Sequence, residues 1–193
     1  MWRCLTCLLL LLPAIGAKGH ADSDIIRAAR AQIGKTRGYD ASYRRLPYPN
    51  GDVPLASGVC TDVVIRTLRA ARGMDLQRLV HEDMRAHFKH YPEHWGLSSP
   101  DPNIDHRRVP NLQVFFQRQG WSLPLSRKPE RFHPGDLVTC NVPGNRPHIM
   151  IISDKRTAKG VPWVIHNIGA GVREENRLFE FRLTGHYRIS AQD

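Results

Sequence analysis

The chain changes its hydrophobic pattern once, near residue 130, and this change limits the folds that it can adopt. Before that point apolar residues recur at helical spacing; after it, short apolar runs alternate with Gly- and Pro-containing turns, as in strands. The predicted helices cover 23–34, 59–71, 76–90 and 111–119, and the predicted strands cover 137–142, 148–153, 161–167, 179–183 and 186–189. Helices followed by an antiparallel meander predict a single α+β domain with long loops at 35–58 and 91–110.

The N-terminal residues 1–21 have the features of a secretory signal peptide. A basic start at Arg3 is followed by a leucine-rich run that is too short to cross a bilayer, and residues 19–21 read Gly-His-Ala, a small-x-small cleavage site. The alternative is that the segment stays attached as an N-terminal anchor. Cleavage would leave residues 22–193, the size of one domain, with no further integral membrane segment. We therefore expect a periplasmic or secreted protein.

The composition is strongly basic, with 28 Lys and Arg against 18 Asp and Glu and a net charge of +10. Cleavage would remove Arg3 and Lys18, leaving 26 basic residues and a charge of +8. An exported protein with this charge suits a polyanionic partner such as a wall polymer, lipid headgroups or nucleic acid. Because the basic residues are dispersed, with no basic run interleaved with aromatic residues, we expect no nucleic-acid partner.

Cys60 lies where a small-residue turn, Ser-Gly at 57–58, leads into the helix predicted at 59–71, which carries Arg66 on its outward face. Free N–H groups and the positive end of the helix dipole favour a thiolate there, and the thiolate is the nucleophilic form of cysteine. We therefore expect a lowered pKa at Cys60. The alternatives are a small buried hydrophobic residue or a disulfide with Cys140. Cys140 lies inside a predicted strand and is more simply a core residue.

Two histidines lie at the ends of predicted strands. His148 opens the strand at 148–153, and His166 lies near the end of the strand at 161–167. A thiol nucleophile needs one imidazole that takes its proton and a second polar group that fixes the tautomer of that imidazole. Cys60, His148 and His166 supply candidates for these three roles. The alternative for each histidine is a solvated surface residue.

Four segments resemble, in the same order, those of the NlpC-type cell-wall peptidases of the papain-like clan. They are Gly-Val-Cys-Thr-Asp-Val-Val at 58–64, Pro-Gly-Asp-Leu-Val at 134–138, His-Ile-Met-Ile-Ile at 148–152 and Val-Ile-His-Asn-Ile-Gly at 164–169. Three further motifs, Tyr-Pro-Asn-Gly-Asp-Val-Pro, Asp-His-Arg-Arg-Val-Pro-Asn and Thr-Gly-His-Tyr-Arg, make the chain more closely similar to the bacterial family of exported proteins named domain of unknown function 1287.

The resemblance implies a papain-like, NlpC-type fold, with N-terminal helices packed on a curved antiparallel sheet, and cleavage of an amide bond in peptidoglycan stem peptides. By position it implies that Cys60 is the nucleophile, His148 the general base and His166 the residue that orients His148. Tyr48 matches the tyrosine that lines the oxyanion site of NlpC-type enzymes. The usual Asp-Cys-Ser-Gly is replaced here by Val-Cys-Thr-Asp, a difference that bears on the substrate more than on the chemistry.

Charged residues near these motifs have two interpretations each. The densest cluster consists of four consecutive residues in the second long loop: Asp105, His106, Arg107 and Arg108. Its arginines could bind an acidic group of the substrate, or the cluster could pin the loop by a salt bridge. Asp62 could bind a substrate amine or satisfy the N-terminus of the helix as a first-turn acid.

Two other functions stay open on the sequence alone. A binding module of the same fold would keep the cleft without turnover, and a metal-dependent hydrolase or nuclease would use the histidines and the basic surface. His186 could complete a three-histidine metal site with His148 and His166, although the spacing matches no standard zinc motif. We expect the thiol hydrolase, acting as a monomer on peptidoglycan or its stem peptides, with no metal and no other cofactor.

Overall fold

The computed structural model describes the backbone of residues 16–190 and the side chains of residues 23–190. Within this range the α-helices are α1 (Gly16–Arg30), α2 (Cys60–Arg72), α3 (Leu76–His87) and α4 (Val109–Arg118). Short 3-10 helices follow or connect them: η1 (Phe88–His90), η2 (Asp105–Arg107) and η3 (Pro129–Arg131). The strands are β1 (Leu137–Val142), β2 (Arg146–Arg156), β3 (Pro162–Asn167), β4 (Val172–Glu175) and β5 (Arg182–Tyr187).

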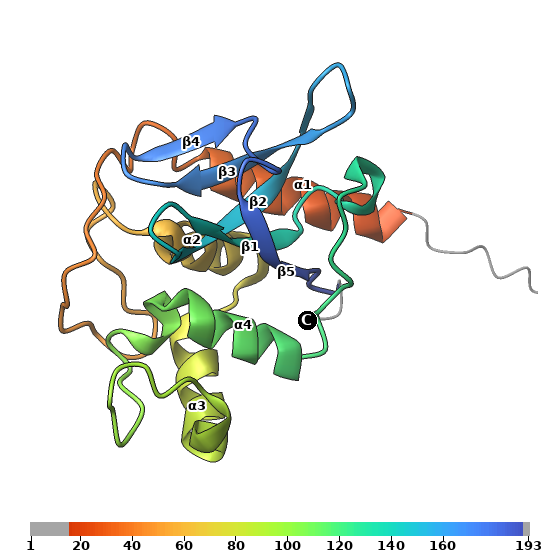
Figure 1. Cartoon of the computed structure of the whole chain (residues 1–193). Coiled ribbons are helices and arrows are strands. Elements are labelled where there is room, and N and C mark those ends of the chain that lie inside the picture. The colour runs from red at the N-terminus through yellow and green to blue at the C-terminus, as the bar shows by residue number, and fades with distance from the viewer. Residues whose placement is uncertain (1–15, 191–193) are drawn as a thin grey trace, which may run out of the picture.

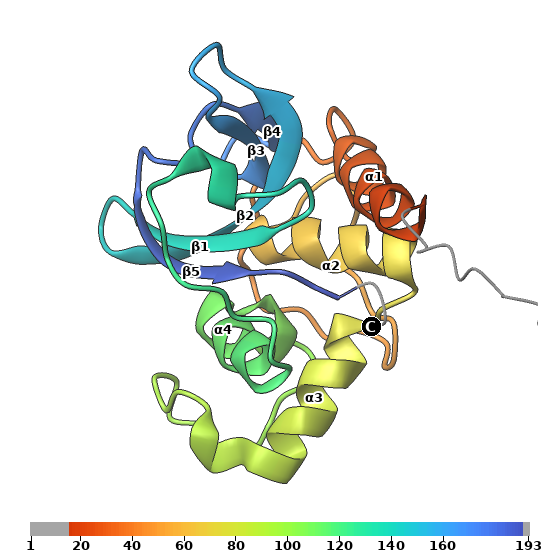
Figure 2. The same cartoon turned by 90° about the vertical axis from the view of Figure 1, so that its right-hand side faces the viewer.

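The strands form one antiparallel sheet in the order β4-β3-β2-β1-β5, with the long strand β2 at its centre (Figure 1). In the β1–β2 ladder His148 lies opposite Cys140, and in the β2–β3 ladder Ile151 lies opposite Ile165. Figure 2 shows α1 and α2 on one side of the curved sheet. The predicted fold class, α+β with helices packed on an antiparallel sheet, is confirmed.

Side chains alternate along the strands, so the sheet has two apolar faces. The first face carries Ile149, Ile151 and Ile165, which pack in one core with apolar side chains of all four helices. The second face carries other residues of the same strands and is covered by loop residues: Val138, Cys140, Met150, Ile152 and Val164 lie under Phe132 and Leu178. Helices therefore cover the first face and loops cover the second.

The loop that precedes α2 is held by a buried arginine. Arg66 is only 8% exposed, and the expectation that it faces solvent is wrong. Its guanidinium donates to the carbonyl oxygens of Val53, Pro54 and Ser57 and to the carboxylate of Asp52, at distances of 2.9 to 3.3 Å. These bonds satisfy backbone groups that the loop cannot pair within itself. They fix the path of the chain on its way to Cys60.

Helix α1 begins at Gly16 and ends at Arg30, earlier at both ends than the predicted helix at 23–34. The helix therefore runs across the expected cleavage site after Ala21. Most of the predicted signal peptide lies outside the described residues, and its removal stays a prediction. Within residues 16–190, no helix combines the length and the apolar character that crossing a membrane requires.

The last part of the sheet differs from the prediction. Strand β4, Val172–Glu175, escapes the pattern because only one of its four residues is apolar. The strand predicted at 179–183 is wrong, because residues 178–180 form a turn and β5 begins only at Arg182. The segments predicted as strands at 179–183 and 186–189 therefore correspond to a turn followed by one continuous strand, β5. The edge strand β4 is a mostly polar segment.

Candidate active site

Cys60 is the first residue of α2, and its side chain is buried, with 3% exposed. The carboxylate of Asp62 accepts a hydrogen bond of 2.6 Å from the Val59 N–H and so closes the first turn of the helix. The backbone N–H groups of Ile149, Thr61 and Cys60 itself lie within hydrogen-bonding reach of the sulfur. The start of α2 and the start of β2 therefore meet at the thiol.

The pKa of Cys60 is raised to about 11, because burial outweighs the three N–H groups, which lower it. The expectation of a lowered pKa is wrong: the helix start acts in the predicted direction, but removal of the thiolate from water has the larger effect. Cys140 is fully buried on the second face of the sheet, where burial raises its pKa to about 12. Both cysteines are free thiols.

His148 and His166 are joined by a hydrogen bond of 2.8 Å between Nε2 of His148 and Nδ1 of His166. The two rings meet edge to face, with centroids 5.1 Å apart. Burial lowers the pKa of His148 to about 3 and also lowers the pKa of His166. Both imidazoles are therefore neutral at pH 7, and each carries a single N–H.

The start of β2 carries both a member of the histidine pair and an N–H that contacts the thiol. His148 directly precedes Ile149, whose N–H points at the Cys60 sulfur. Because His148 alternates with Ile149, it lies on the loop-covered face, whereas Cys60 belongs to the core on the helix-covered face. Among the described residues 23–190, no hydrogen bond joins the thiol to His148.

A carboxylate that the sequence analysis missed continues the series of hydrogen bonds that joins His148 to His166. Nε2 of His166 lies 3.2 Å from Oε2 of Glu175, the last residue of β4. In the β3–β4 ladder His166 lies opposite Arg173, so Glu175, two residues further along, shares its face of the sheet. The signal that could have identified Glu175 was this register, which was hidden because β4 was not predicted.

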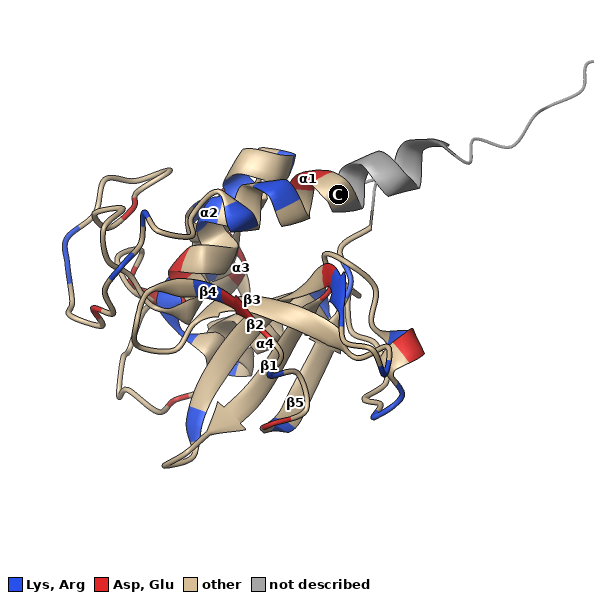
Figure 3. Cartoon of the chain, turned by 90° about the horizontal axis from the view of Figure 1, so that it is seen from above, with Lys and Arg blue, Asp and Glu red and all other residues tan. Residues whose placement is uncertain are grey.

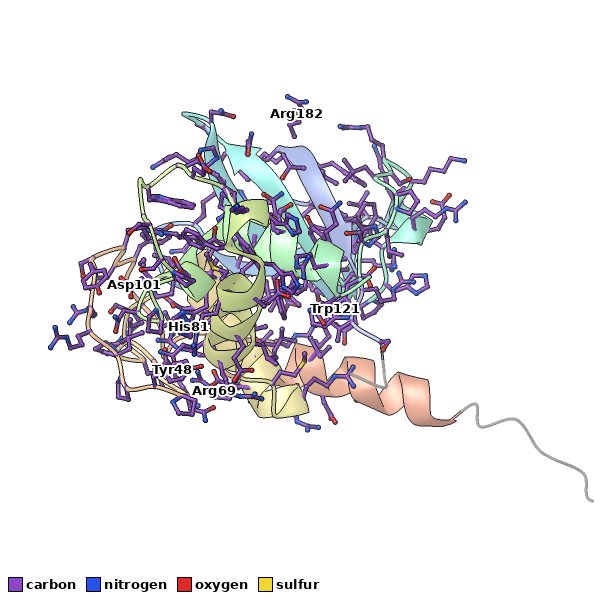
Figure 4. All side chains as sticks on the ribbon, turned by 90° about the horizontal axis from the view of Figure 1, so that it is seen from below. Tyr48, Arg69, His81, Asp101, Trp121 and Arg182 are labelled. Atoms are coloured by element: carbon purple, nitrogen blue, oxygen red, sulfur yellow. The ribbon has the colours of Figure 1, made fainter. Side chains whose placement is uncertain are left out.

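Tyr48 lies away from the thiol. Its ring packs edge to face on His81 of α3, with centroids 5.3 Å apart, and 44% of the residue is exposed (Figure 4). A different tyrosine of the same loop, Tyr39, is affected by a charge on Cys60: burial and then that charge raise the pKa of Tyr39 to about 12. The role of Tyr48 at an oxyanion site stays a prediction, and Tyr39 is a second candidate for that role.

Asp62 and Arg107 form a buried ion pair, with Nε and Nη2 of Arg107 at 2.9 and 3.0 Å from the two carboxylate oxygens. Arg107 also donates to the carbonyl oxygens of Asp40 and Ser42, and its own carbonyl accepts a bond of 2.9 Å from the Thr61 hydroxyl. Of the two interpretations, these contacts match the structural one: Asp62 closes the helix start and Arg107 ties two loops to it.

The other members of the charged cluster also turn inward. The carboxylate of Asp105 accepts hydrogen bonds from the Asp101 N–H and from Arg108, and the guanidinium of Arg108 lies 4.0 Å from the ring centre of Trp95. His106 is 2% exposed, and burial lowers its pKa to about 3. The cluster therefore anchors the loop that precedes α4, as the structural interpretation expects.

His186 does not join the histidine pair. Its Nε2 lies 2.8 Å from the carboxylate of Asp136, which also binds the guanidinium of Arg188, and its ring stacks on Phe132. Among the side chains of residues 23–190, no group of three or more His, Cys, Asp or Glu is arranged to hold a metal ion. The Pro-Gly-Asp and Thr-Gly-His-Tyr-Arg motifs meet in this Asp136–His186–Arg188 cluster.

The fold and these side chains define an α+β protein in which a helix-start cysteine lies near a pair of hydrogen-bonded histidines on neighbouring strands. The chain belongs to the family described as Domain of unknown function (DUF1287), whose family model matches residues 26–189. Membership of this family, expected from the motifs, is confirmed.

Known proteins that are similar to the chain include one bacterial relative and one solved structure. The Uncharacterized protein YijF of Escherichia coli (strain K12) is 51% identical over 164 residues, which are 85% of this chain and 80% of that protein. The structure of NlpC1 from Trichomonas vaginalis is similar over 86% of this chain, with 12% identity and a TM-score of 0.44. The similarity covers 44% of the NlpC1 chain, so this protein spans less than half of its length.

Proposed function

We propose that the protein is an exported thiol hydrolase that cleaves an amide bond in peptidoglycan stem peptides. The observation that carries the proposal is the hydrogen bond of 2.8 Å between His148 and His166, at the start of the strand whose next N–H points at the Cys60 sulfur. A nucleophile, an adjacent base and a group that orients the base are the elements of covalent catalysis at a thiol.

In the proposed reaction His148 takes the proton of the Cys60 thiol as the sulfur attacks the amide carbonyl carbon. The proton then passes to the leaving amine as the carbon–nitrogen bond breaks, which leaves a thioester on Cys60. Water, deprotonated by His148, attacks the thioester carbon, and the departing sulfur takes the proton back. His166 keeps the ring of His148 in place through both steps.

Hydrogen-bond donors would stabilise the negative charge that develops on the carbonyl oxygen during the attack. The N–H of Cys60 at the helix start and the hydroxyl of Tyr39 are the proposed donors to the carbonyl oxygen as it becomes negative. Both the thiol and the imidazole are neutral at rest, so the step separates charge in a buried place. Fixed donors reduce that cost because they need no rearrangement during the reaction.

The substrate class rests on the family resemblance and on charge. Lys and Arg lie on loops and helices alike, with acidic residues between them, rather than in one stripe (Figure 3). A surface with dispersed basic residues attracts an acidic polymer. Binding along the phosphate backbone of a nucleic acid would instead favour basic residues clustered in a stripe. Export through the predicted signal peptide would bring this surface to the cell wall, where we propose that the protein acts as a monomer.

One observation favours a second candidate, a binding module of the same fold that does not turn over its ligand. The Cys60 side chain is 3% exposed and burial raises its pKa, so the thiol is shielded from solvent in the structure. A module of this kind would bind stem peptides equally well when Cys60 is replaced by alanine.

Hydrolysis of a synthetic stem peptide by single variants separates these candidates. Cys60→Ala and His148→Ala should each lose about three orders of magnitude of activity, because nucleophile and base act as a unit. His166→Asn should keep more activity than His166→Ala, because an amide can replace the hydrogen bond to His148. Activity that survives Cys60→Ala and is abolished by a chelator would point instead to a metal-dependent hydrolase.

A further inference from the structure

The hydrogen-bond chain of the two histidines ends on a carboxylate at the protein surface. His166 is buried, whereas the side chain of Glu175 is 29% exposed and contacts Nε2 of His166 at 3.2 Å. Glu175 also lines an open pocket of about 510 Å³, together with Arg173, Arg177 and the turn at residues 168–171. A substitution at Glu175 therefore faces solvent and leaves no void in the core.

The carboxylate sets the direction of every hydrogen bond in the chain. An ionised glutamate can only accept, so Nε2 of His166 must carry the hydrogen. Because His166 is neutral, its Nδ1 then has a lone pair and must accept from Nε2 of His148 across the 2.8 Å contact. His148 is also neutral, so its single hydrogen is used in this bond. Nδ1 of His148 is left with a lone pair.

The opposite direction would disable the base. If Nδ1 of His166 carried the hydrogen, it would donate to Nε2 of His148, and the only hydrogen of His148 would lie on Nδ1. Nδ1 is the only ring nitrogen of His148 that the bond between the histidines leaves unused, and as an N–H it could not take the thiol proton. The two directions satisfy the bond between the histidines equally well, so a third group has to choose between them.

We propose that Glu175 is that group: a positioning residue that fixes the tautomers of His166 and His148 and thereby makes Nδ1 of His148 the atom that accepts the thiol proton. Its catalytic role rests on the proposed hydrolase activity, whereas the tautomers do not. Glu175 acts through His166 and has no contact with the Cys60 sulfur among the hydrogen bonds of the described residues.

Two neighbouring arginines lie close to the Glu175 carboxylate, but as hydrogen-bond donors they cannot take its place as the acceptor for His166. Nη1 of Arg177 lies 3.8 Å and Nη1 of Arg173 lies 4.0 Å from the Glu175 oxygens. Arg177 makes its shorter contact, 2.7 Å, with Glu180. Glu180 is thus a nearby carboxylate of the same charge that makes no hydrogen bond to either histidine, and Glu180→Gln is the matched control.

Long-range proton–nitrogen NMR spectra of the full chain, labelled with ¹⁵N at histidine, read the tautomers directly. In the unaltered protein, Nε2 should carry the hydrogen in both His148 and His166. Glu175→Gln, which keeps the size of the side chain, should give a mixture of tautomers at both residues, and Glu180→Gln should change neither. Hydrogen on Nδ1 of His148 in the unaltered protein, or unchanged tautomers in Glu175→Gln, would overturn the proposal.

Kinetics on a synthetic stem peptide test the consequence. Glu175→Gln should lower kcat by about 10- to 100-fold with little change in KM, as loss of a group that orients a catalytic histidine does, and Glu175→Asp should restore part of it. An unchanged kcat alongside altered tautomers would refute the positioning role. An unaltered protein that does not hydrolyse the peptide at all would instead refute the proposed hydrolase, and the NMR spectra would still decide the tautomers.

Discussion

The guanidinium of Arg107 binds both carboxylate oxygens of Asp62, a residue in the first turn of the helix that begins at Cys60, at 2.9 and 3.0 Å. The same carboxylate accepts the Val59 N–H, so one ion pair joins the helix start to the loop before α4. Two residues that could have bound a substrate are thus occupied in holding the helix start that carries Cys60.

Removal of Arg107 should be strongly destabilising. Arg107→Ala would leave the Asp62 carboxylate buried without its partner, and we expect the free energy of unfolding to fall by about 3–5 kcal/mol. Urea unfolding measures the change. The exposed pair Arg44–Asp40 provides the control, since Arg44→Ala should leave the urea midpoint unchanged. Equal midpoints for Arg107→Ala and Arg44→Ala would show that the buried pair does not hold the site.

The raised pKa of Cys60 predicts slow alkylation at neutral pH. The rate of iodoacetamide labelling at Cys60 should still be rising between pH 8 and 10, where an ordinary thiol with a pKa of about 8.5 levels off. Peptide mapping assigns the label, and Cys140, which is buried more completely, should react later still. A labelling rate at Cys60 that reaches its plateau below pH 8 would contradict the account of a desolvated thiol.

Tyr39 and Tyr48 form a matched pair of loop tyrosines. If the Tyr39 hydroxyl stabilises the developing oxyanion, Tyr39→Phe should lower kcat by about 10²- to 10³-fold, as loss of one such donor does in other hydrolases. Tyr48→Phe should leave kcat unchanged, because Tyr48 packs against α3. Steady-state kinetics with a stem peptide measure both. A loss of kcat in Tyr48→Phe but not in Tyr39→Phe would assign the donor role to Tyr48 instead.

Buried neutral histidines predict a loss of stability in acid. The folded-state pKa of His106 is about 3, below the unfolded value of about 6.5, so the unfolded chain binds a proton that the folded protein does not. Stability should therefore fall as the pH drops from about 6.5 toward 3, with each such histidine adding about 1.4 kcal/mol per pH unit.

Urea unfolding at a series of pH values tests this contribution. In the His106→Gln variant, the free energy of unfolding should fall less steeply between about pH 6 and 4.5. The difference in slope should be the contribution of one histidine, about 1.4 kcal/mol per pH unit. The slope of the His106→Gln variant would equal that of the unaltered protein if His106 titrates normally in the fold.

Local patterns predicted much of the fold and part of the candidate site. The strand at Leu137–Val142 has the predicted bounds, because an apolar run lies between two Gly- and Pro-containing turns. Motif resemblance identified His148 and His166, which the structure brings into hydrogen-bonding contact. In both cases the determining signal lies within a few consecutive residues.

The remaining features depend on contacts between distant segments. Burial of Cys60 under the start of β2 decides its pKa, and the helix start alone indicates the opposite shift. The path of the loop that carries Tyr39 is set by hydrogen bonds from Arg66, one of which reaches Thr36, thirty residues earlier in the chain. Contacts between such distant residues leave no periodic pattern in the sequence. Glu175 lies on an edge strand in which only Val172 is apolar, so no hydrophobic alternation marks it.

The most direct test of the central claim is mass spectrometry of purified peptidoglycan sacculi after digestion with the full chain and with its Cys60→Ala variant. The account predicts that the unaltered protein releases stem-peptide fragments, each with a new amine and a new carboxylate at the cleaved amide bond, and that Cys60→Ala releases none. The same fragments released at the same rate by Cys60→Ala would contradict the thiol mechanism.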